Sequence, residues 1–379
     1  MNAATLVVFL SLAIWLVLLF GRGFFWLMRE RDERDTPPEP VCWPSVTAVV
    51  PARNEAELIA RSLGSLLAQD YPGRFRVILV DDQSGDGTGA LARSLDNGRL
   101  TVVDGAAHPP GWTGKLFAVH QGVECASAAD PPDYLWLTDA DIAHTPDNLR
   151  RLVARAQAGK LVLTSLMAKL HCESVAERFL VPAFVFFFDM LFPFAWANDP
   201  RKRTAAAAGG CMLVRREALA RAGGIEAIRS EIIDDCALAG RLKAQGPIWL
   251  GLTERAVSIR PYPRLADIRA MVARSGYAQL GYSPLILAGT VLGMVLLYVV
   301  PLAGLATGGL GALAGALAWA AMTVAFQPML RFYRRSPLWG LALPAIGVFY
   351  AAFTIESAVQ FWRGRGGMWK GRAQAIART

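Results

Sequence analysis

Charged residues are distributed very unevenly along this chain of 379 residues, and the distribution limits the architectures that it can adopt. Residues 1–21, 275–330 and 336–355 contain no Asp, Glu, Lys or Arg, whereas residues 22–274 hold nearly all of the acidic side chains. The charged fraction of the whole chain is 18%, against about 25% in ordinary soluble domains. The pattern predicts a polar folded domain that lies between membrane-spanning segments.

The uncharged stretches have the length that membrane spans require. A helix needs about 20 apolar residues to cross a bilayer. Ala3–Phe20 fits one crossing, and it lacks the basic start and the small-residue cleavage site of a removable signal peptide. The C-terminal stretch predicts two further spans at about 284–303 and 309–330. The segment 338–362, which contains Pro344, is either a fourth span or a re-entrant hairpin.

These spans divide the chain into segments with different expected environments. We expect an N-terminal anchor (1–21), a proline-rich linker (22–44), a globular domain (45–274), a membrane region with two to three spans (275–362) and a basic tail (363–379). Basic residues follow the first and third spans, which by the positive-inside rule places the globular domain in the cytoplasm. The tail residues fit this orientation only if 338–362 does not cross fully; they are Arg363, Arg365, Lys370, Arg372 and Arg378.

The net charge of +8 does not require a nucleic-acid partner. Basic residues flank the predicted spans, where anionic lipid headgroups attract them. We therefore expect the protein to contact a membrane and no nucleic acid. The aromatic run at 179–188 is too short to span a bilayer, so it predicts either a core helix or a helix at the membrane surface.

Strand-like and helical patterns alternate in the globular domain. Apolar strand-like runs occur at 46–50, 77–80, 100–103 and 134–137, and helical patterns occur at 56–69, 88–95 and 115–127. This alternation predicts an α/β fold with a mainly parallel sheet and helices on both faces. Ligands bind such sheets beyond the carboxyl ends of the strands. Acidic residues follow three of the four runs, which predicts a site for a cation and a nucleotide at that edge.

The strongest single motif is Asp139-Ala-Asp141, which follows the fourth strand-like run. Two carboxylates at i and i+2 can face one divalent metal that bridges diphosphate oxygens. A surface turn is the alternative, but the position directly after a buried strand favours the metal. Asp82 follows the second strand, where its carboxylate can accept from a base N–H such as uracil N3. A simple strand-to-helix turn is the alternative for Asp82.

Two further positions complete the predicted site. The sequence has neither a P-loop nor a G-x-G-x-x-G turn after its first strand, but Lys115 stands at a predicted helix N-terminus that favours anions. Lys115 is therefore a candidate to neutralise a diphosphate, or else a solvated lysine. Asp234 and Asp235 precede an amphipathic helix at 236–245, and one of them is the candidate base for removing a hydroxyl proton. They could instead be helix N-terminal acids that interact with the helix dipole.

Taken together, these motifs resemble those of a known enzyme family. The motifs Pro51-x-Arg-Asn-Glu55, Asp81-Asp82-x-Ser-x-Asp-x-Thr88, Asp139-x-Asp141 and Asp234-Asp235 resemble family 2 glycosyltransferases with the GT-A fold, over about residues 45–275. The segments 111–115, 198–204, 205–212 and 233–239 look like those of the hopene-associated glycosyltransferases, which are found with bacterial hopanoid synthesis genes. The flanking membrane spans fit that group too.

The resemblance implies a role for each matching residue. It implies that Pro51, Arg53, Glu55 and Asp82 contact the donor base and ribose. It also implies that Asp139 and Asp141 bind the nucleotide and Mg²⁺ or Mn²⁺, with Asp141 the main ligand. Asp235 matches the catalytic base, and Asp234 replaces the Glu that usually precedes it. Met271 and Ser275 interrupt the Gln-x-x-Arg-Trp motif of processive members, which favours a single transfer.

The resemblance thus implies a multi-pass enzyme of the bacterial inner membrane. Its donor is expected to be a nucleotide diphosphate-sugar, a UDP-sugar by preference, and its acceptor a lipid that is hopanoid-related. Two alternatives remain: a polyprenyl-phosphate sugar synthase or polysaccharide synthase on the same fold, and a non-catalytic membrane scaffold or nucleotide sensor.

Overall fold

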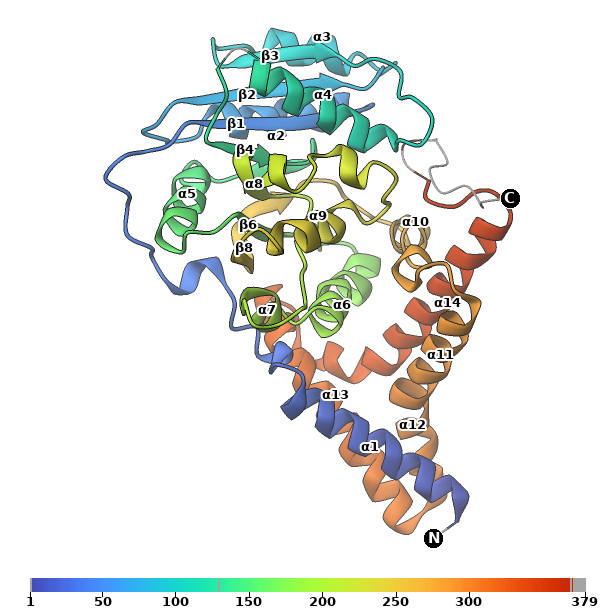
Figure 1. Cartoon of the computed structure of the whole chain (residues 1–379). Helices are drawn as coiled ribbons and strands as arrows, with labels where there is room; N and C mark the ends of the chain where they lie inside the picture. The colour runs from blue at the N-terminus through green and yellow to red at the C-terminus, as the bar shows by residue number, and fades with distance from the viewer. Residues whose placement is uncertain (1, 129, 369, 371–379) are drawn as a thin grey trace. The chain divides into compact units, whose positions relative to one another are not determined.

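The computed structural model describes residues 2–128, 130–368 and 370, so the tail residues Arg372 and Arg378 lie outside the described part. Contacts divide the chain into two compact units. One contains Glu30–His171 and Trp196–Arg260, and the other contains Met1–Arg29, Cys172–Ala195 and the segment from Pro261 onward. Figure 1 labels most of the helices and strands of the two units.

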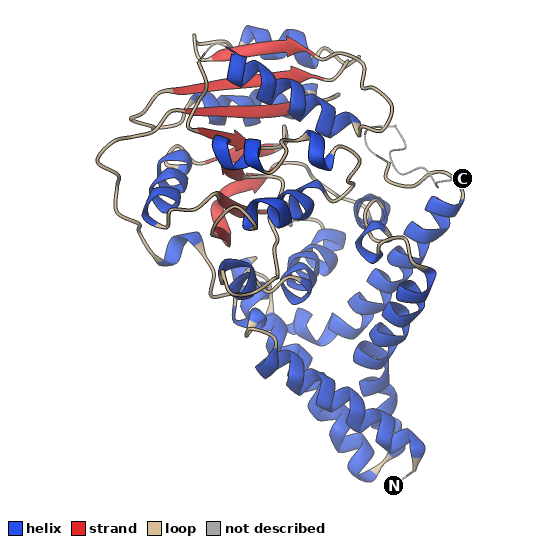
Figure 2. Cartoon of the chain, viewed as in Figure 1, coloured by secondary structure: helices blue, strands red, loops and turns tan. Residues whose placement is uncertain are grey.

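The first unit, termed here the sheet unit, is built on one eight-stranded sheet in the order β3-β2-β1-β4-β7-β6-β8-β5 (Figure 2). The strands are β1 (Val46–Ala52), β2 (Phe75–Asp81), β3 (Leu100–Asp104), β4 (Tyr134–Leu137), β5 (Ile142–His144), β6 (Leu163–Lys169), β7 (Met212–Arg215) and β8 (Ile248–Ser258). Strands β1 to β4 pair in parallel, as does β6 with β8. β7 runs antiparallel to both β4 and β6, and β5 runs antiparallel to β8.

The sheet is buried on both faces because its strands are apolar at nearly every position. Every residue of β1 is buried. Successive side chains point to opposite faces of a strand, and the two faces of β1 accordingly contribute to separate cores: Ala48 and Val50 to one, Val49 to the other. This explains why the strands read as continuous apolar runs rather than as alternating ones.

Helices cover both faces of the sheet. One core includes side chains from α2 (Ala56–Leu67), α3 (Thr88–Ser94) and α5 (Asn148–Ala158). The other includes side chains from α4 (Gly114–Ala128), α8 (Arg216–Arg221) and α9 (Asp234–Lys243). The predicted α/β fold with helices on both faces is therefore confirmed. The antiparallel β7 was not predicted, because only the first four strands were identified from the sequence pattern.

The second half of the predicted linker is part of the sheet unit. Asp32, in the short 3-10 helix Asp32–Arg34, is 2% exposed, and its carboxylate lies 2.9 Å from Arg255 and 3.6 Å from Arg155. Arg155 also pairs with Asp35 and lies over the ring of Trp249. The backbone N–H of Leu252 on β8 donates to Glu30. Residues 30–35 are thus held to β8 and α5 by backbone hydrogen bonding and by the ion pairs of the buried Asp32.

The second unit, termed here the apolar unit, consists of helices. They are α1 (Ala3–Gly21), α6 (Val175–Leu191), α10 (Leu265–Ala273), α11 (Pro284–Met294), α12 (Val300–Gly304), α13 (Gly309–Phe332) and α14 (Leu343–Trp362), and α7 (Phe194–Asn198) begins here. Four helical stretches in the described part of the chain are long and apolar enough to cross a membrane: Ala3–Gly21, Pro284–Thr307, Gly309–Phe332 and Pro337–Trp362. They coincide with the three predicted spans and with the segment 338–362.

The aromatic run at 179–188 lies in α6, which belongs to the apolar unit. Phe186 contacts Phe326 of α13, with ring centroids 5.2 Å apart. Phe187 contacts Tyr350 of α14 at 4.9 Å, and the Tyr350 hydroxyl donates to the carbonyl of Leu180. Buried aromatic pairs of this geometry add stability beyond their buried area. α6 is therefore a packed helix of the apolar unit, although in the sequence it comes between two segments that belong to the sheet unit.

Candidate active site

Most of the predicted site residues follow the carboxyl ends of β1, β2 and β4. These three strands are parallel neighbours, so their carboxyl ends meet at one edge of the sheet. Arg53 and Glu55 follow β1, Asp82 follows β2, and Asp139 and Asp141 follow β4. The topology therefore brings the predicted motifs to one edge, where three small clusters of charged side chains form.

The first cluster is centred on Lys115, in the first turn of α4. Its Nζ lies 3.0 Å from Asp139 and 3.1 Å from Asp234, so it joins the strand edge to the start of α9. Burial alone would lower the pKa of Lys115, but the two carboxylates outweigh it and raise the pKa. Lys115 is therefore fully charged at neutral pH. Burial, together with the neighbouring Asp141 and Asp234, raises the pKa of Asp139.

Asp235 adjoins this cluster in the first turn of α9. Its carboxylate accepts the backbone N–H groups of Gly209 at 3.0 Å and Cys236 at 2.7 Å. Burial and the adjacent Asp234 raise its pKa to about 6. A carboxylate with a pKa near the working pH is suited to accept a proton in catalysis. A Cβ at position 209 would lie 3.4 Å from the Lys115 Nζ and 3.6 Å from the Asp235 carboxylate, which is ordinary van der Waals contact.

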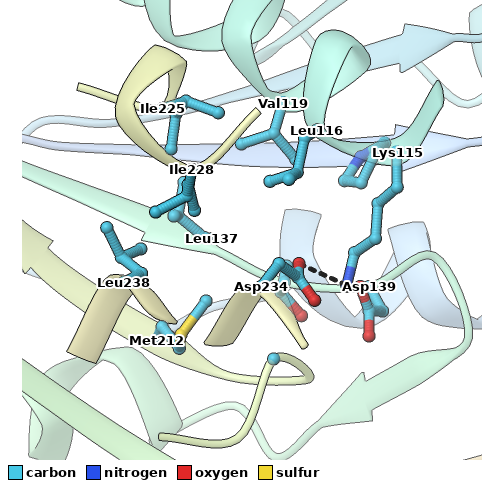
Figure 3. Close-up of a pocket in the computed structure, with 13 residues that line it drawn as sticks. Lys115, Leu116, Val119, Leu137, Asp139, Met212, Ile225, Ile228, Asp234 and Leu238 are labelled. Carbon is cyan, nitrogen blue, oxygen red and sulfur yellow. Dashed lines mark ion pairs between the residues drawn. The ribbon is translucent and has the colours of Figure 1, made fainter. Parts of the chain in front are cut away.

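A pocket opens between these side chains (Figure 3). Lys115, Asp139 and Asp234 lie at one end of it, and apolar side chains such as Leu116, Ile225 and Leu238 line the other. The remaining lining residues are Pro51, Val119, Leu137, Thr138, Gly209, Met212 and Ile228. Of the predicted site residues, Pro51, Lys115, Asp139 and Asp234 line this pocket.

The second cluster joins Asp141 to Glu55 through Arg260. The Arg260 Nε lies 2.7 Å from Asp141, and the other end of the guanidinium pairs with Glu55, which is 8% exposed. The two carboxylates of the Asp139-Ala-Asp141 motif therefore contact different cations, Lys115 and Arg260. No group of three or more His, Cys, Asp or Glu side chains in the described part of the chain converges closely enough to hold a metal by itself.

The third cluster contains Arg53 and Asp82. Arg53 donates to the carbonyl of Asp82 at 2.5 Å and lies 3.4 Å from its carboxylate, which is almost fully buried. The Arg53 Nε–H is buried and has no acceptor among the described residues. Such an unpaired donor is costly unless a ligand accepts from it. Asn54 and Ser84 connect the same two loops, because the backbone N–H of Asn54 donates to the Ser84 hydroxyl.

A buried polar network fixes the loop that carries Asp139 and Asp141. The Thr138 hydroxyl donates to the carbonyl of Gly210 at 2.8 Å and lies 3.0 Å from the Nε2 of His144. Because the Thr138 hydroxyl proton is already donated to Gly210, the Nε2–H of His144 donates to the Thr138 oxygen. The Nδ1 of His144 accepts from the Asn148 amide. Burial lowers the pKa of His144 to about 3, so the ring stays neutral. The network ties the end of β4 to the turn at 209–210 that contacts Asp235.

Arg260 and Gly209 were not among the residues predicted from the sequence. Arg260 comes two residues after the end of β8, and the same rule that identified Asp82 and Asp139 applies to it. It was missed because the strand pattern was followed only as far as residue 137. Gly209 lies in a run of alanines and glycines that carries no chemical signal. Its contribution to the site is the backbone N–H that it donates to Asp235 in the folded chain.

Comparisons with known proteins identify glycosyltransferases that are similar to this chain. Residues 47–223 match the family model Glycosyl transferase family 2. Succinoglycan biosynthesis protein ExoO of Rhizobium meliloti is 34% identical over 117 residues, which are 30% of this chain and 30% of that protein. 4,4'-Diaponeurosporenoate glycosyltransferase of Staphylococcus aureus is 37% identical over 98 residues, 26% of this chain and 24% of that protein. The chain thus spans less than a third of the length of these curated relatives.

A solved structure resembles the chain over a greater length. The mannosyltransferase PcManGT from Pyrobaculum calidifontis, in complex with GDP-Man and Mn²⁺, matches with a TM-score of 0.52. The match covers 96% of this chain and 100% of that chain, with 20% sequence identity. At this identity the likeness concerns the fold, which is the GT-A fold.

Proposed function

We propose that this chain, whose residues 47–223 form a family 2 glycosyltransferase domain with the GT-A fold, transfers a sugar from a nucleotide diphosphate-sugar to a lipid acceptor. The observation that carries the proposal is the convergence of Lys115, Asp139 and Asp234 beside Asp235. These residues come from three separate elements, and no structural requirement of the sheet explains why so many charges are gathered there.

The donor is assigned to the edge of β1, β2 and β4. Pro51, Arg53, Glu55 and Asp82 would contact its base and ribose, and the buried Arg53 Nε–H supplies a donor that suits a nucleotide oxygen. Lys115 would neutralise the diphosphate, because it is buried beside the pocket and carries its full charge. We favour a UDP-sugar, since the Asp82 carboxylate can accept a hydrogen bond from uracil N3–H. GDP-sugars are the first alternative to test, because PcManGT was solved with GDP-Man.

The acidic residues of the site fit a divalent cation. The three clusters contain six carboxylates (Glu55, Asp82, Asp139, Asp141, Asp234, Asp235) against three cations (Arg53, Lys115, Arg260). Mg²⁺ is usually bound by one or two carboxylates together with substrate phosphates, so a complete protein cage is not required. Asp141 and Asp139 would hold Mg²⁺ or Mn²⁺, which when bound acts as a Lewis acid toward the diphosphate.

Asp235 is assigned as the base of a single displacement. Its carboxylate would take the proton of the acceptor hydroxyl while that oxygen attacks the anomeric carbon. The bond between this carbon and the diphosphate oxygen breaks, and the nucleoside diphosphate leaves. The transferred sugar then has the opposite configuration at its anomeric carbon. Two backbone N–H groups orient the Asp235 carboxylate, and Asp234 is held by Lys115. Such a base typically contributes about 10²- to 10⁴-fold to the rate.

The acceptor class rests on the apolar helices and on the relatives. Four stretches could cross a membrane, which supports a lipid acceptor and a multi-pass position. The basic residues after the first and third spans favour the sheet unit in the cytoplasm, and the family resemblance favours a bacterial inner membrane. The matched relative from Staphylococcus aureus is by its name a glycosyltransferase of diaponeurosporenoate. We propose a hopanoid-related acceptor from the resemblance of segments 111–115, 198–204, 205–212 and 233–239.

The test compares two aspartates that each lie in the first turn of a helix. We expect Asp235→Asn to lower sugar transfer to extracted membrane lipid by about 10²- to 10⁴-fold while nucleotide binding is retained. Asp267→Asn is the matched control, because Asp267 also lies in the first turn of a helix and pairs with Arg264. Transfer at the wild-type rate by Asp235→Asn would contradict the base assignment.

The acceptor is tested separately by lipid profiling. Mass spectrometry of lipids from a deletion strain should show the loss of one glycolipid, which is restored by the wild-type protein and not by Asp235→Asn. An acid-labile, phosphate-linked product would identify a polyprenyl-phosphate sugar synthase instead. Metal-dependent nucleotide binding without any transfer would identify a non-catalytic sensor.

A further inference from the structure

The Arg260 guanidinium forms an ion pair with Asp141, the carboxylate that the proposed function assigns to the metal. Arg260 Nε lies 2.7 Å from Asp141, and its Nη2 pairs with Glu55. Both carboxylates are largely buried, with side-chain exposures of 18% for Asp141 and 8% for Glu55. Ion pairs of Arg with two buried carboxylates are stronger than exposed pairs, and Arg does not lose its proton at any working pH.

The sheet sets the position of Arg260. β8 pairs antiparallel with β5, so that Ser258 lies opposite Ile142. The next residue continues this contact, because the backbone N–H of Ile259 donates to the carbonyl of Asp141 at 2.9 Å. Arg260 is therefore placed beside Asp141 by the backbone, and its contact with the carboxylate does not depend on a long flexible loop.

We infer that Arg260 acts as a cation latch, which keeps the metal ligand Asp141 neutralised until a metal and a nucleotide diphosphate bind together. The inference rests on the proposed function. A divalent ion that approaches Asp141 alone meets the positive charge of the guanidinium. A nucleotide diphosphate brings negative charge that offsets this repulsion and offers the guanidinium new acceptors. Metal and nucleotide should therefore bind cooperatively, with Arg260 as a positioning residue that couples them.

The chain has a second cation that can be compared with Arg260. Lys115 contacts Asp139, the other carboxylate of the motif, and so the metal ligands are matched by one cation each. Lys115 also contacts Asp234 beside the proposed base, whereas Arg260 contacts Glu55 on the donor side. Removing Arg260 therefore frees Asp141 without removing the cation beside Asp235.

The test measures Mn²⁺ binding by the full-length protein in detergent, with free Mn²⁺ detected by electron paramagnetic resonance. Titrations are made with and without GDP or UDP, for the wild type and for Arg260→Gln. Without nucleotide, we expect Arg260→Gln to bind Mn²⁺ at least about tenfold more tightly than the wild type. Because the nucleotide already offsets the Arg260 charge in the wild type, Mn²⁺ binding to the nucleotide-bound protein should change little, and the factor by which the nucleotide tightens Mn²⁺ binding should fall by the same amount. By reciprocity, the factor by which Mn²⁺ tightens nucleotide binding should fall equally.

Two further variants serve as controls. Arg264→Gln removes an arginine four residues away that pairs with Asp267, and it should bind Mn²⁺ as the wild type does. Arg260→Lys keeps the charge and should restore most of the coupling, which also provides a test if Arg260→Gln does not fold. Equal or weaker Mn²⁺ binding by Arg260→Gln without nucleotide would overturn this inference alone. Failure of the wild type to bind Mn²⁺ even with GDP or UDP would overturn the proposed function as well.

Discussion

At the scale of single residues, the site depends on how burial and neighbouring charges set the proton affinity of Asp235. Its pKa is raised to about 6 by burial and by Asp234, while Lys115 opposes the rise. A base must be deprotonated to accept a proton, so turnover should fall as the pH drops below about 6. Lys115→Met removes the opposing charge, raises the pKa of Asp235 further, and should move this acidic limb to higher pH.

The measurement is a pH profile of kcat for each protein. It runs from about pH 4.5 to about pH 8.5, so that it includes the pKa of Asp235 at about 6. Lys160→Met is the control, because Lys160 is exposed at the end of α5 and contacts none of the site residues given above. An acidic limb that stays at the same pH in Lys115→Met would show that Lys115 does not influence the base.

Sequence patterns located the charged residues well but could not assign their partners. Asp82, Asp139 and Asp235 were identified because strand ends and acidic pairs can be recognised in one dimension. The partners Arg260 and Gly209 come from the segment just after β8 and from the turn before β7, which lie far away along the chain. Their contacts are decided by strand order, and strand order beyond β4 could not be read from the periodicity of the sequence.

At the scale of elements, the loop after β4 is held by the polar network of Thr138 and His144. Thr138→Val keeps the shape of the side chain but removes the hydroxyl, which leaves the Gly210 carbonyl and the His144 N–H unpaired. We expect a loss of about 1–3 kcal/mol in the free energy of unfolding. We also expect a lower kcat, because the loop carries Asp139 and the turn carries the donor N–H to Asp235.

The control for this prediction is Thr101→Val, which alters an exposed threonine in β3. The temperature of thermal unfolding in detergent and the steady-state transfer rate of this variant should both be close to those of the wild type. If Thr138→Val matched Thr101→Val in both measurements, the network would have no part in positioning the loop.

Element boundaries show the same division between what could and could not be predicted. The helix expected at 236–245 begins at Asp234 in the structure, so both acids lie within its first turn and not before it. Strand periods and apolar lengths are local properties, and the predicted spans therefore coincide with the helices found. The assignment of α6 to the apolar unit depends on aromatic contacts with α13 and α14, and the alternatives of core helix and surface helix could not be separated beforehand.

At the scale of the whole molecule, the segment after α1 is part of the sheet unit from Glu30 onward. Arg155 is its main anchor, since it pairs with Asp35 and Asp32 and lies over Trp249. Arg155→Ala removes one of the three arginines that surround the buried Asp32, together with the pair to the exposed Asp35. Because Arg255 and Arg151 remain beside Asp32, we expect a cost of about 1–3 kcal/mol in the free energy of unfolding. We expect residues 30–40 to become sensitive to protease at temperatures at which the wild-type chain is resistant.

Arg150→Ala is the matched control, because Arg150 lies on the same helix but forms exposed pairs with Glu39 and Asp70. Its removal should change protease sensitivity much less than the removal of Arg155. Equal cleavage of the two variants would show that the buried charges do not anchor the segment.

The insertion of α6 into the apolar unit has a consequence for biosynthesis. The aromatic side chains Phe186 and Phe187 contact α13 and α14, and α14 ends at Trp362. Ribosomes add about 5–20 residues per second, so the contacts of α6 can be completed only roughly 10–30 s after its own synthesis. During this interval the nascent helix exposes an aromatic surface, and we expect insertion machinery or chaperones to shield it. Synonymous codons that slow translation after residue 191 would lengthen this interval and lower the yield of folded protein.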